Sequence, residues 1–79
     1  MLQQVMTSQE RFLLHQNLTK YFREGELRTV VFYLGLDYDD LEGQGKADKA
    51  RELVALLERT GRITELVEIC SMLRPNVLW

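Results

Sequence analysis

The sequence has few of the residues that hold small proteins together by covalent or metal cross-links. One cysteine, one proline and one histidine occur in 79 residues. Cys70 alone cannot form a disulfide within the chain, and no Cys/His cluster is present to bind structural zinc. Stability must therefore come from packing. We expect a cytoplasmic protein, because a reducing compartment suits such a chain.

Long hydrophobic runs and a strong net charge are also missing. Every apolar stretch is far shorter than the roughly 20 residues of a membrane-spanning helix, and residues 1–6 lack the basic start of a secretory signal. Ten Lys and Arg stand against twelve Asp and Glu, a net charge of -2. This balance gives little attraction to polyanions. We expect neither a membrane protein nor a nucleic-acid-binding protein.

The composition that remains is that of one globular domain. Hydrophobic residues make up 46% of the chain and charged residues 28%, which is typical of a folded protein. We predict a single helical interaction domain over residues 1–79. A chain of this length buries a modest core, and a deep substrate cleft is hard to accommodate in it.

Apolar residues recur at three- and four-residue steps, which predicts helices. The first begins at Thr7, because a hydroxyl three residues before Glu10 is the spacing of a capping box. It runs to about Phe22, and Gly25 interrupts it. Its apolar face is Leu14, Leu18, Tyr21 and Phe22, and the faces of three further helices are Leu27, Val30, Val31 and Leu34; Ala50, Leu53, Val54 and Leu57; and Ile63, Leu66, Val67, Cys70 and Leu73.

Glycine and proline mark the ends of these helices. Gly35 and Gly61 are typical helix-closing residues, and Pro75 ends the last helix. Residues 29–36 are strand-like by propensity, but a single strand has no partner for its backbone. A short helical turn at residues 37–41 brings the total to four long helices and one short one. With short connections, they predict an all-α, compact antiparallel bundle.

Two motifs that suggest ligand sites do not match in detail. Gly43–Lys46 is similar to a phosphate-binding loop, but a P-loop has glycine where Asp40 stands and a hydroxyl where Ala47 stands. We interpret it as the turn that starts a helix. The acids of residues 37–42 do not follow the ligand order of an EF-hand. We therefore expect no metal and no cofactor.

Catalytic chemistry has no positive signal. His15 has no nucleophile or carboxylate at a spacing that would form a catalytic group. Cys70 falls on an apolar helix face, which favours an inert buried thiol. We expect that the domain is not an enzyme.

Charge is separated between two segments. Acids gather at residues 37–42, and bases lie on or beside the helix that follows. The predicted interaction residues are Asp37, Asp39, Asp40, Glu42, Lys46, Lys49, Arg51, Arg59 and Arg62. If the two groups lie on different faces, they favour head-to-tail association that can extend into rings or filaments. The alternative is that both are solvated surface.

The stretch Tyr33–Leu66 resembles the bacterial effector-associated, death-like domains, most specifically in Gly43–Ala47 continuing into Lys49–Val54. The resemblance covers Tyr21–Pro75 and implies a death-fold-like bundle of six antiparallel helices. We therefore expect five to six helices. The sixth would come from residues 1–6, from a break in the first helix or from residues 76–79. Glu42 replaces a proline that is frequent in the family, which loosens that turn.

The resemblance implies an adaptor that binds homotypic or related death-like domains. Such domains recruit or cluster effectors of the protease, NTPase or TIR type, in cis or in trans, in prokaryotic conflict, cell-death or signalling systems. Homo-oligomers are one expected form. The alternative is a structural or regulatory helical domain that binds an unrelated protein through exposed apolar residues, namely Phe32, Tyr33 and residues 77–79.

Overall fold

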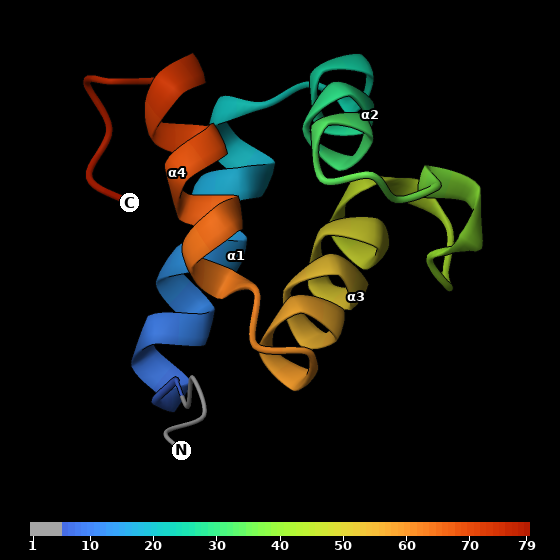
Figure 1. The fold of residues 1–79 in the computed structure, drawn as a ribbon, viewed down its shortest axis with the longest axis horizontal. Helices are drawn as coiled ribbons and strands as arrows, with labels where there is room; N and C mark the ends of the chain where they lie inside the picture. The colour runs from blue at the N-terminus through green and yellow to red at the C-terminus, as the bar shows by residue number, and fades with distance from the viewer. Residues whose placement is uncertain (1–5) are drawn as a thin grey trace.

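The computed structural model describes residues 6–79, which form four α-helices and one 3₁₀ turn with no strand among them (Figure 1). The elements are α1 (Ser8–Tyr21), α2 (Glu24–Tyr33), the 3₁₀ turn η1 (Tyr38–Asp40), α3 (Gly45–Arg59) and α4 (Ile63–Leu73). In Figure 1, α3 runs in the opposite direction to α1 and α4. The all-α prediction is confirmed for the described residues, including the helical interpretation of residues 29–33.

The number of helices corrects the prediction of five to six. The short helical turn predicted in the acidic segment is present as the three-residue η1, but it is a 3₁₀ turn and does not make a fifth α-helix. α1 is continuous from Ser8 to Tyr21, and residues 76–79 are not helical, so neither supplies a sixth helix. The remaining predicted source, residues 1–6, lies outside the described residues apart from Met6, which is not helical.

The start of α1 is set by a side-chain cap, and its end by a residue that turns into the core. The Thr7 hydroxyl accepts a hydrogen bond from the Glu10 N–H at 3.1 Å, and the Glu10 carboxylate accepts one from the Thr7 N–H at 2.8 Å, which confirms the predicted capping box. α1 ends at Tyr21, before extended residue Phe22, whose side chain is buried. Gly25 is therefore not the interruption, since it lies in the first turn of α2.

The core is built around α3, which contacts α1, α2 and α4. Its buried residues Ala50, Leu53, Val54 and Leu57 are the predicted inner face, and the predicted face of the preceding helix is buried as well. α4 buries Leu66 and Cys70 but leaves Val67 partly exposed. The buried residues of all these elements form one hydrophobic core, which contains Leu14, Leu18, Phe22, Leu27, Val30, Val31, Leu34, Tyr38, Leu41, Ala50, Leu53, Val54, Leu57, Leu66 and Cys70.

A charged contact joins α3 to the start of α1. The Glu58 carboxylate accepts hydrogen bonds from the Arg11 guanidinium at 2.8 and 2.9 Å and from the Met6 N–H at 3.0 Å. These donors lower the pKa of Glu58 from an ordinary value of 4.5 to about 2, and the Arg11 hydrogen bond is the largest cause. The carboxylate therefore stabilises the fold above pH 4.5, and the stabilisation is lost as the pH falls towards 2.

Substituting Glu58→Gln is expected to lower the melting temperature at pH 7 and to reduce the loss of stability between pH 4.5 and 2. Thermal unfolding followed by circular dichroism across this range measures both effects. Glu68→Gln, at an exposed position on α4, is the matched control and should follow the wild-type profile. Parallel profiles for Glu58→Gln and the wild type would contradict the assignment.

Candidate interaction surfaces

The acidic loop, residues 37–42, is anchored to the hydrophobic core by two apolar side chains. Tyr38 and Leu41 are buried, whereas Asp37, Asp39, Asp40 and Glu42 are exposed. The Asp37 carboxylate accepts a hydrogen bond from the Asp39 N–H at 3.0 Å and so caps η1. The alternation of buried and exposed residues turns the carboxylates outward. The loop is therefore a negatively charged surface on a fixed support.

Cations hold this loop against the helices. The Lys49 ammonium donates hydrogen bonds to the carbonyls of Tyr38, at 3.2 Å, and of Leu41. The Arg28 guanidinium lies 4.3 Å from the centre of the Tyr38 ring, a cation–π contact. Burial is the main cause that raises the pKa of Tyr38, and the nearby Glu24 adds to it. Arg28 also reaches Asp39 at 3.5 Å, an exposed ion pair.

Three of the five predicted basic residues donate hydrogen bonds to backbone carbonyls of the domain. Besides Lys49, the Lys46 ammonium donates to the carbonyls of Thr19 at 2.7 Å and Phe22 at 2.9 Å, at the end of α1. Arg62 donates to the Leu34 carbonyl at 2.8 Å and pairs with Glu65. Such cations satisfy carbonyls that have no partner within their helix. In the Gly43–Val54 motif, both lysines thus connect α3 to other elements.

The other two predicted bases are exposed. Arg51 lies near Asp48 and Glu52, at 3.4 and 3.7 Å, with 60% of its side chain exposed. Arg59 lines a shallow depression together with Asp40 and Glu42. The structure therefore brings Arg59 beside the acidic loop and leaves Arg51 facing solvent.

A cationic depression that the sequence did not reveal lies at the end of α1. It is lined by Lys20, Tyr21, Phe22, Arg23, Glu26, Lys46 and Arg74. Arg74 donates to the Tyr21 carbonyl at 3.2 Å and to the Glu26 carboxylate, and its guanidinium lies 5.0 Å from the centre of the Phe22 ring. The Arg23 N–H and Arg74 lower the pKa of Glu26. Arg74 is remote in sequence, so no local spacing could have predicted this cluster.

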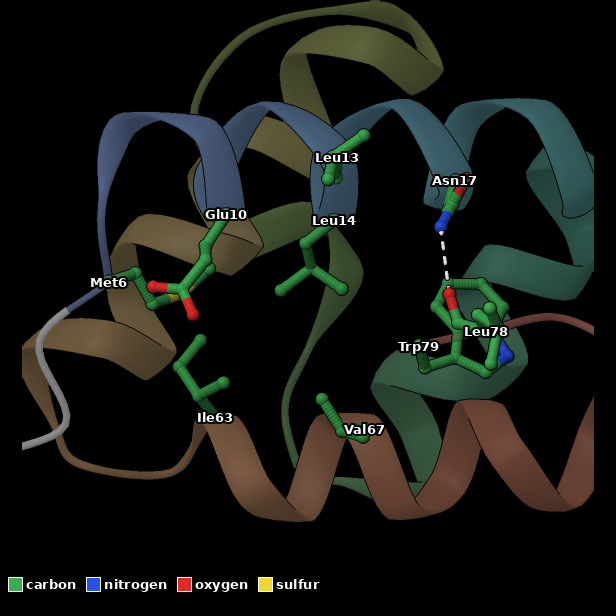
Figure 2. Close-up of a pocket in the computed structure, with 9 residues that line it drawn as sticks. All are labelled: Met6, Glu10, Leu13, Leu14, Asn17, Ile63, Val67, Leu78 and Trp79. Carbon is green, nitrogen blue, oxygen red and sulfur yellow. Dashed lines mark hydrogen bonds between the residues drawn. The ribbon is translucent and has the colours of Figure 1, made fainter.

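An apolar groove runs between α1 and α4, closed at one end by the C-terminal residues (Figure 2). It has a volume of about 600 Å³. Figure 2 shows Leu13 and Leu14 on one wall and Val67 on the other. It is lined by Met6, Glu10, Leu13, Leu14, Asn17, Ile63, Val67, Leu78 and Trp79.

Large apolar side chains are also exposed elsewhere. Phe32 and Tyr33, here called the aromatic pair, are 74% and 56% exposed at the end of α2. The predicted apolar tail is not a free patch, because the Trp79 ring stacks on Phe22 at 5.6 Å between centres. The Asn17 side-chain amide donates to the Leu78 carbonyl at 3.2 Å, as Figure 2 shows. Within the tail, Leu78 remains 94% exposed.

The two residues considered as possible catalytic groups, His15 and Cys70, both contact other parts of the fold. An imidazole nitrogen of His15 lies 2.9 Å from the Ala47 carbonyl oxygen. Cys70 is buried as predicted, and burial raises the pKa of its thiol to about 12. Within residues 6–79, no three or more His, Cys, Asp or Glu side chains are grouped to hold a metal ion. No helix of the described chain is long and apolar enough to cross a membrane.

Comparison with known families assigns the chain. The sequence profile of effector-associated domain 7 matches residues 14–75, a span that contains the acidic loop, all of α2, α3 and α4, and most of α1. No curated protein and no solved structure matches significantly. The chain belongs to the effector-associated domain 7 family, so the predicted resemblance to effector-associated domains is confirmed.

Proposed function

We propose that this domain is a non-catalytic adaptor that recruits or clusters effectors by binding related, death-like domains. Membership of an effector-associated family carries the proposal. The attached or recruited effector is a protease, an NTPase or a TIR-type protein, in cis or in trans. The setting is prokaryotic conflict, cell-death or signalling in the cytoplasm. The death-fold relationship of the bundle is part of the same proposal.

The arrangement of side chains supports a function that resides on the surface. The side chains of Lys46, Lys49 and Arg62 donate hydrogen bonds to backbone carbonyls. Their positive charges are therefore used to hold the fold together. The buried thiol of Cys70 has its pKa raised to about 12, which makes it a poor nucleophile at neutral pH. Exposed charges on fixed supports remain. These charges select partners and steer association.

In this proposal the acidic loop of one domain meets exposed bases of another. Asp37, Asp39, Asp40 and Glu42 present the negative charge, and Arg51 and Arg59 contribute positive charge on α3. Lys46, Lys49 and Arg62 hold the surface in shape. The cationic depression at Lys20 and Arg23 adds a second positive surface. Because these charges are exposed, salt should weaken the association.

Charge reversal tests this contact. Asp40→Lys and Arg51→Glu, made singly, are each expected to weaken binding to a related domain by about 5- to 30-fold, equivalent to about 1–2 kcal/mol. Combining Asp40→Lys on one partner with Arg51→Glu on the other should restore part of the affinity if the two side chains meet. Isothermal titration calorimetry at low salt provides the dissociation constants.

The matched control is Glu68→Lys, which reverses an exposed acid on α4 outside the acidic loop. It should leave the affinity within about twofold of wild type, as expected for a charge remote from the contact. If both loop and α3 reversals bind as tightly as the wild type, these charges do not form the contact.

A further inference from the structure

We infer that the apolar groove between α1 and α4 binds the aromatic pair, Phe32 and Tyr33, of a second copy of this chain. The inference deepens the proposed function and rests on it, because it names a second contact surface through which such domains cluster. The contact is apolar and separate from the charged one.

The groove has the size and lining of a binding site. Its volume of about 600 Å³ lies within the roughly 300–1,000 Å³ of typical ligand pockets. Leu13, which is 47% exposed, and the partly exposed Val67 form its apolar walls. The tail covers only one end, where Trp79 packs on Phe22 and Leu78 stays exposed. The rest of the groove offers apolar surface to a partner.

The aromatic pair is large, apolar and exposed, as the occupant of an apolar groove must be. The two rings lie 6.0 Å apart, so they form one knob at the end of α2. Aromatic side chains of this size bury about 150–250 Å² each when they enter an interface, and clustered exposed apolar residues mark contact surfaces. Phe32 and Tyr33 are 74% and 56% exposed, so most of this area is still available for a partner.

Charge beside the two surfaces is complementary. Arg28 lies one helical turn before Phe32 on the same face of α2, and half of its side chain is exposed. The groove carries an exposed acid, Glu10, on its α1 wall. The 3.5 Å pair of Arg28 with Asp39 is exposed and therefore weak. The exposed guanidinium of Arg28, which also lies over the Tyr38 ring, can thus exchange Asp39 for Glu10 of the second copy when Phe32 enters the groove.

The placement of the two surfaces makes the contact head-to-tail. In Figure 1, α2 lies on the far side of α4 from the C-terminal tail, whose last residues line one end of the groove. Each copy therefore uses its knob on one neighbour and its groove on another. A contact of two different surfaces is heterologous and continues into a ring or filament. This geometry suits a domain that gathers several effectors.

A complementation experiment on the whole chain tests the inference. Phe32→Ser removes the knob and leaves the groove, and Leu13→Glu blocks the groove and leaves the knob. By sedimentation velocity at high salt, which screens the separate charged contact, wild type should form oligomers that grow with concentration. Each variant alone should associate about tenfold or more weakly. Their mixture should form a one-to-one complex that does not grow, because only one intact junction remains.

Phe12 supplies matched controls, since it is 61% exposed on α1 and does not line the groove. Phe12→Ser and Phe12→Glu should assemble as the wild type does, and circular dichroism should show that all variants are folded. A monomeric mixture of the two variants overturns the inference, as does wild-type assembly by either variant. A wild type that stays monomeric yet binds a related domain overturns this inference alone. Loss of that binding by Asp40→Lys but not by Phe32→Ser would then leave the proposed function standing.

Discussion

Replacing Leu53 by alanine is expected to lower the free energy of unfolding by about 2–5 kcal/mol, since the lost apolar contacts leave a cavity. Leu53 is fully buried on α3, the helix that contacts the other three. Small domains have only about 5–15 kcal/mol of stability in total. The variant should therefore unfold at a much lower temperature, and it should lose partner binding to the extent that it is unfolded.

The same substitution at Leu78, which is 94% exposed, is the control. Leu78→Ala should change stability by less than about 0.5 kcal/mol. Thermal and urea unfolding followed by circular dichroism give both values. Similar losses for the two variants would show that α3 is not the centre of the core.

The Gly43→Ala substitution is expected to cost about 2–4 kcal/mol, from a strained backbone and a steric clash together. Gly43 has a φ angle of 90°, and a Cβ atom added there would lie 2.6 Å from the Asp48 Cβ. Asp48 cannot move freely, because its carboxylate accepts a hydrogen bond from the Gln44 N–H at 3.2 Å. The substitution should therefore disturb the start of α3, where both structural lysines lie.

Substitutions at two other glycines separate the cost of backbone strain from the cost of the steric clash. Gly45 has a φ angle of 81° but no atom within 4 Å of an added Cβ, so Gly45→Ala should cost only the backbone part, about 1–2 kcal/mol. Gly25 has neither constraint and lies in α2, so alanine there should be neutral or stabilise by up to about 1 kcal/mol. Urea unfolding gives the order, and equal costs at Gly43 and Gly45 would exclude the clash.

The features that depend on local sequence were predictable. The capping box of Thr7 and Glu10 and the buried face of α3 follow from spacing alone, because a helix repeats every 3.6 residues. The end of α1 was predicted to within one residue, at about Phe22, but its cause was wrongly assigned to Gly25, since the break is made by Phe22 turning into the core. A buried aromatic at a helix end leaves no local signal as clear as a glycine.

The features that depend on distant residues were not predictable. The roles of Lys46 and Arg62 require carbonyls 27 and 28 residues away, at Thr19 and Leu34. From spacing alone, these side chains are indistinguishable from solvated bases. The cationic depression and the apolar groove likewise arise only when residues from both ends of the chain meet. Charge segregation in the sequence therefore predicted two charged surfaces, while the fold decided which charges face outward.

The binding of a related domain is the most direct measure of the proposed function. The domain should be mixed with the effector-associated domains encoded beside it, at high micromolar concentration and low salt, and binding should be followed by calorimetry and co-elution. We expect a complex with at least one of them, weakened by added salt. Strictly monomeric behaviour, with no association with itself or with any of these domains, would contradict an adaptor that works through its surface.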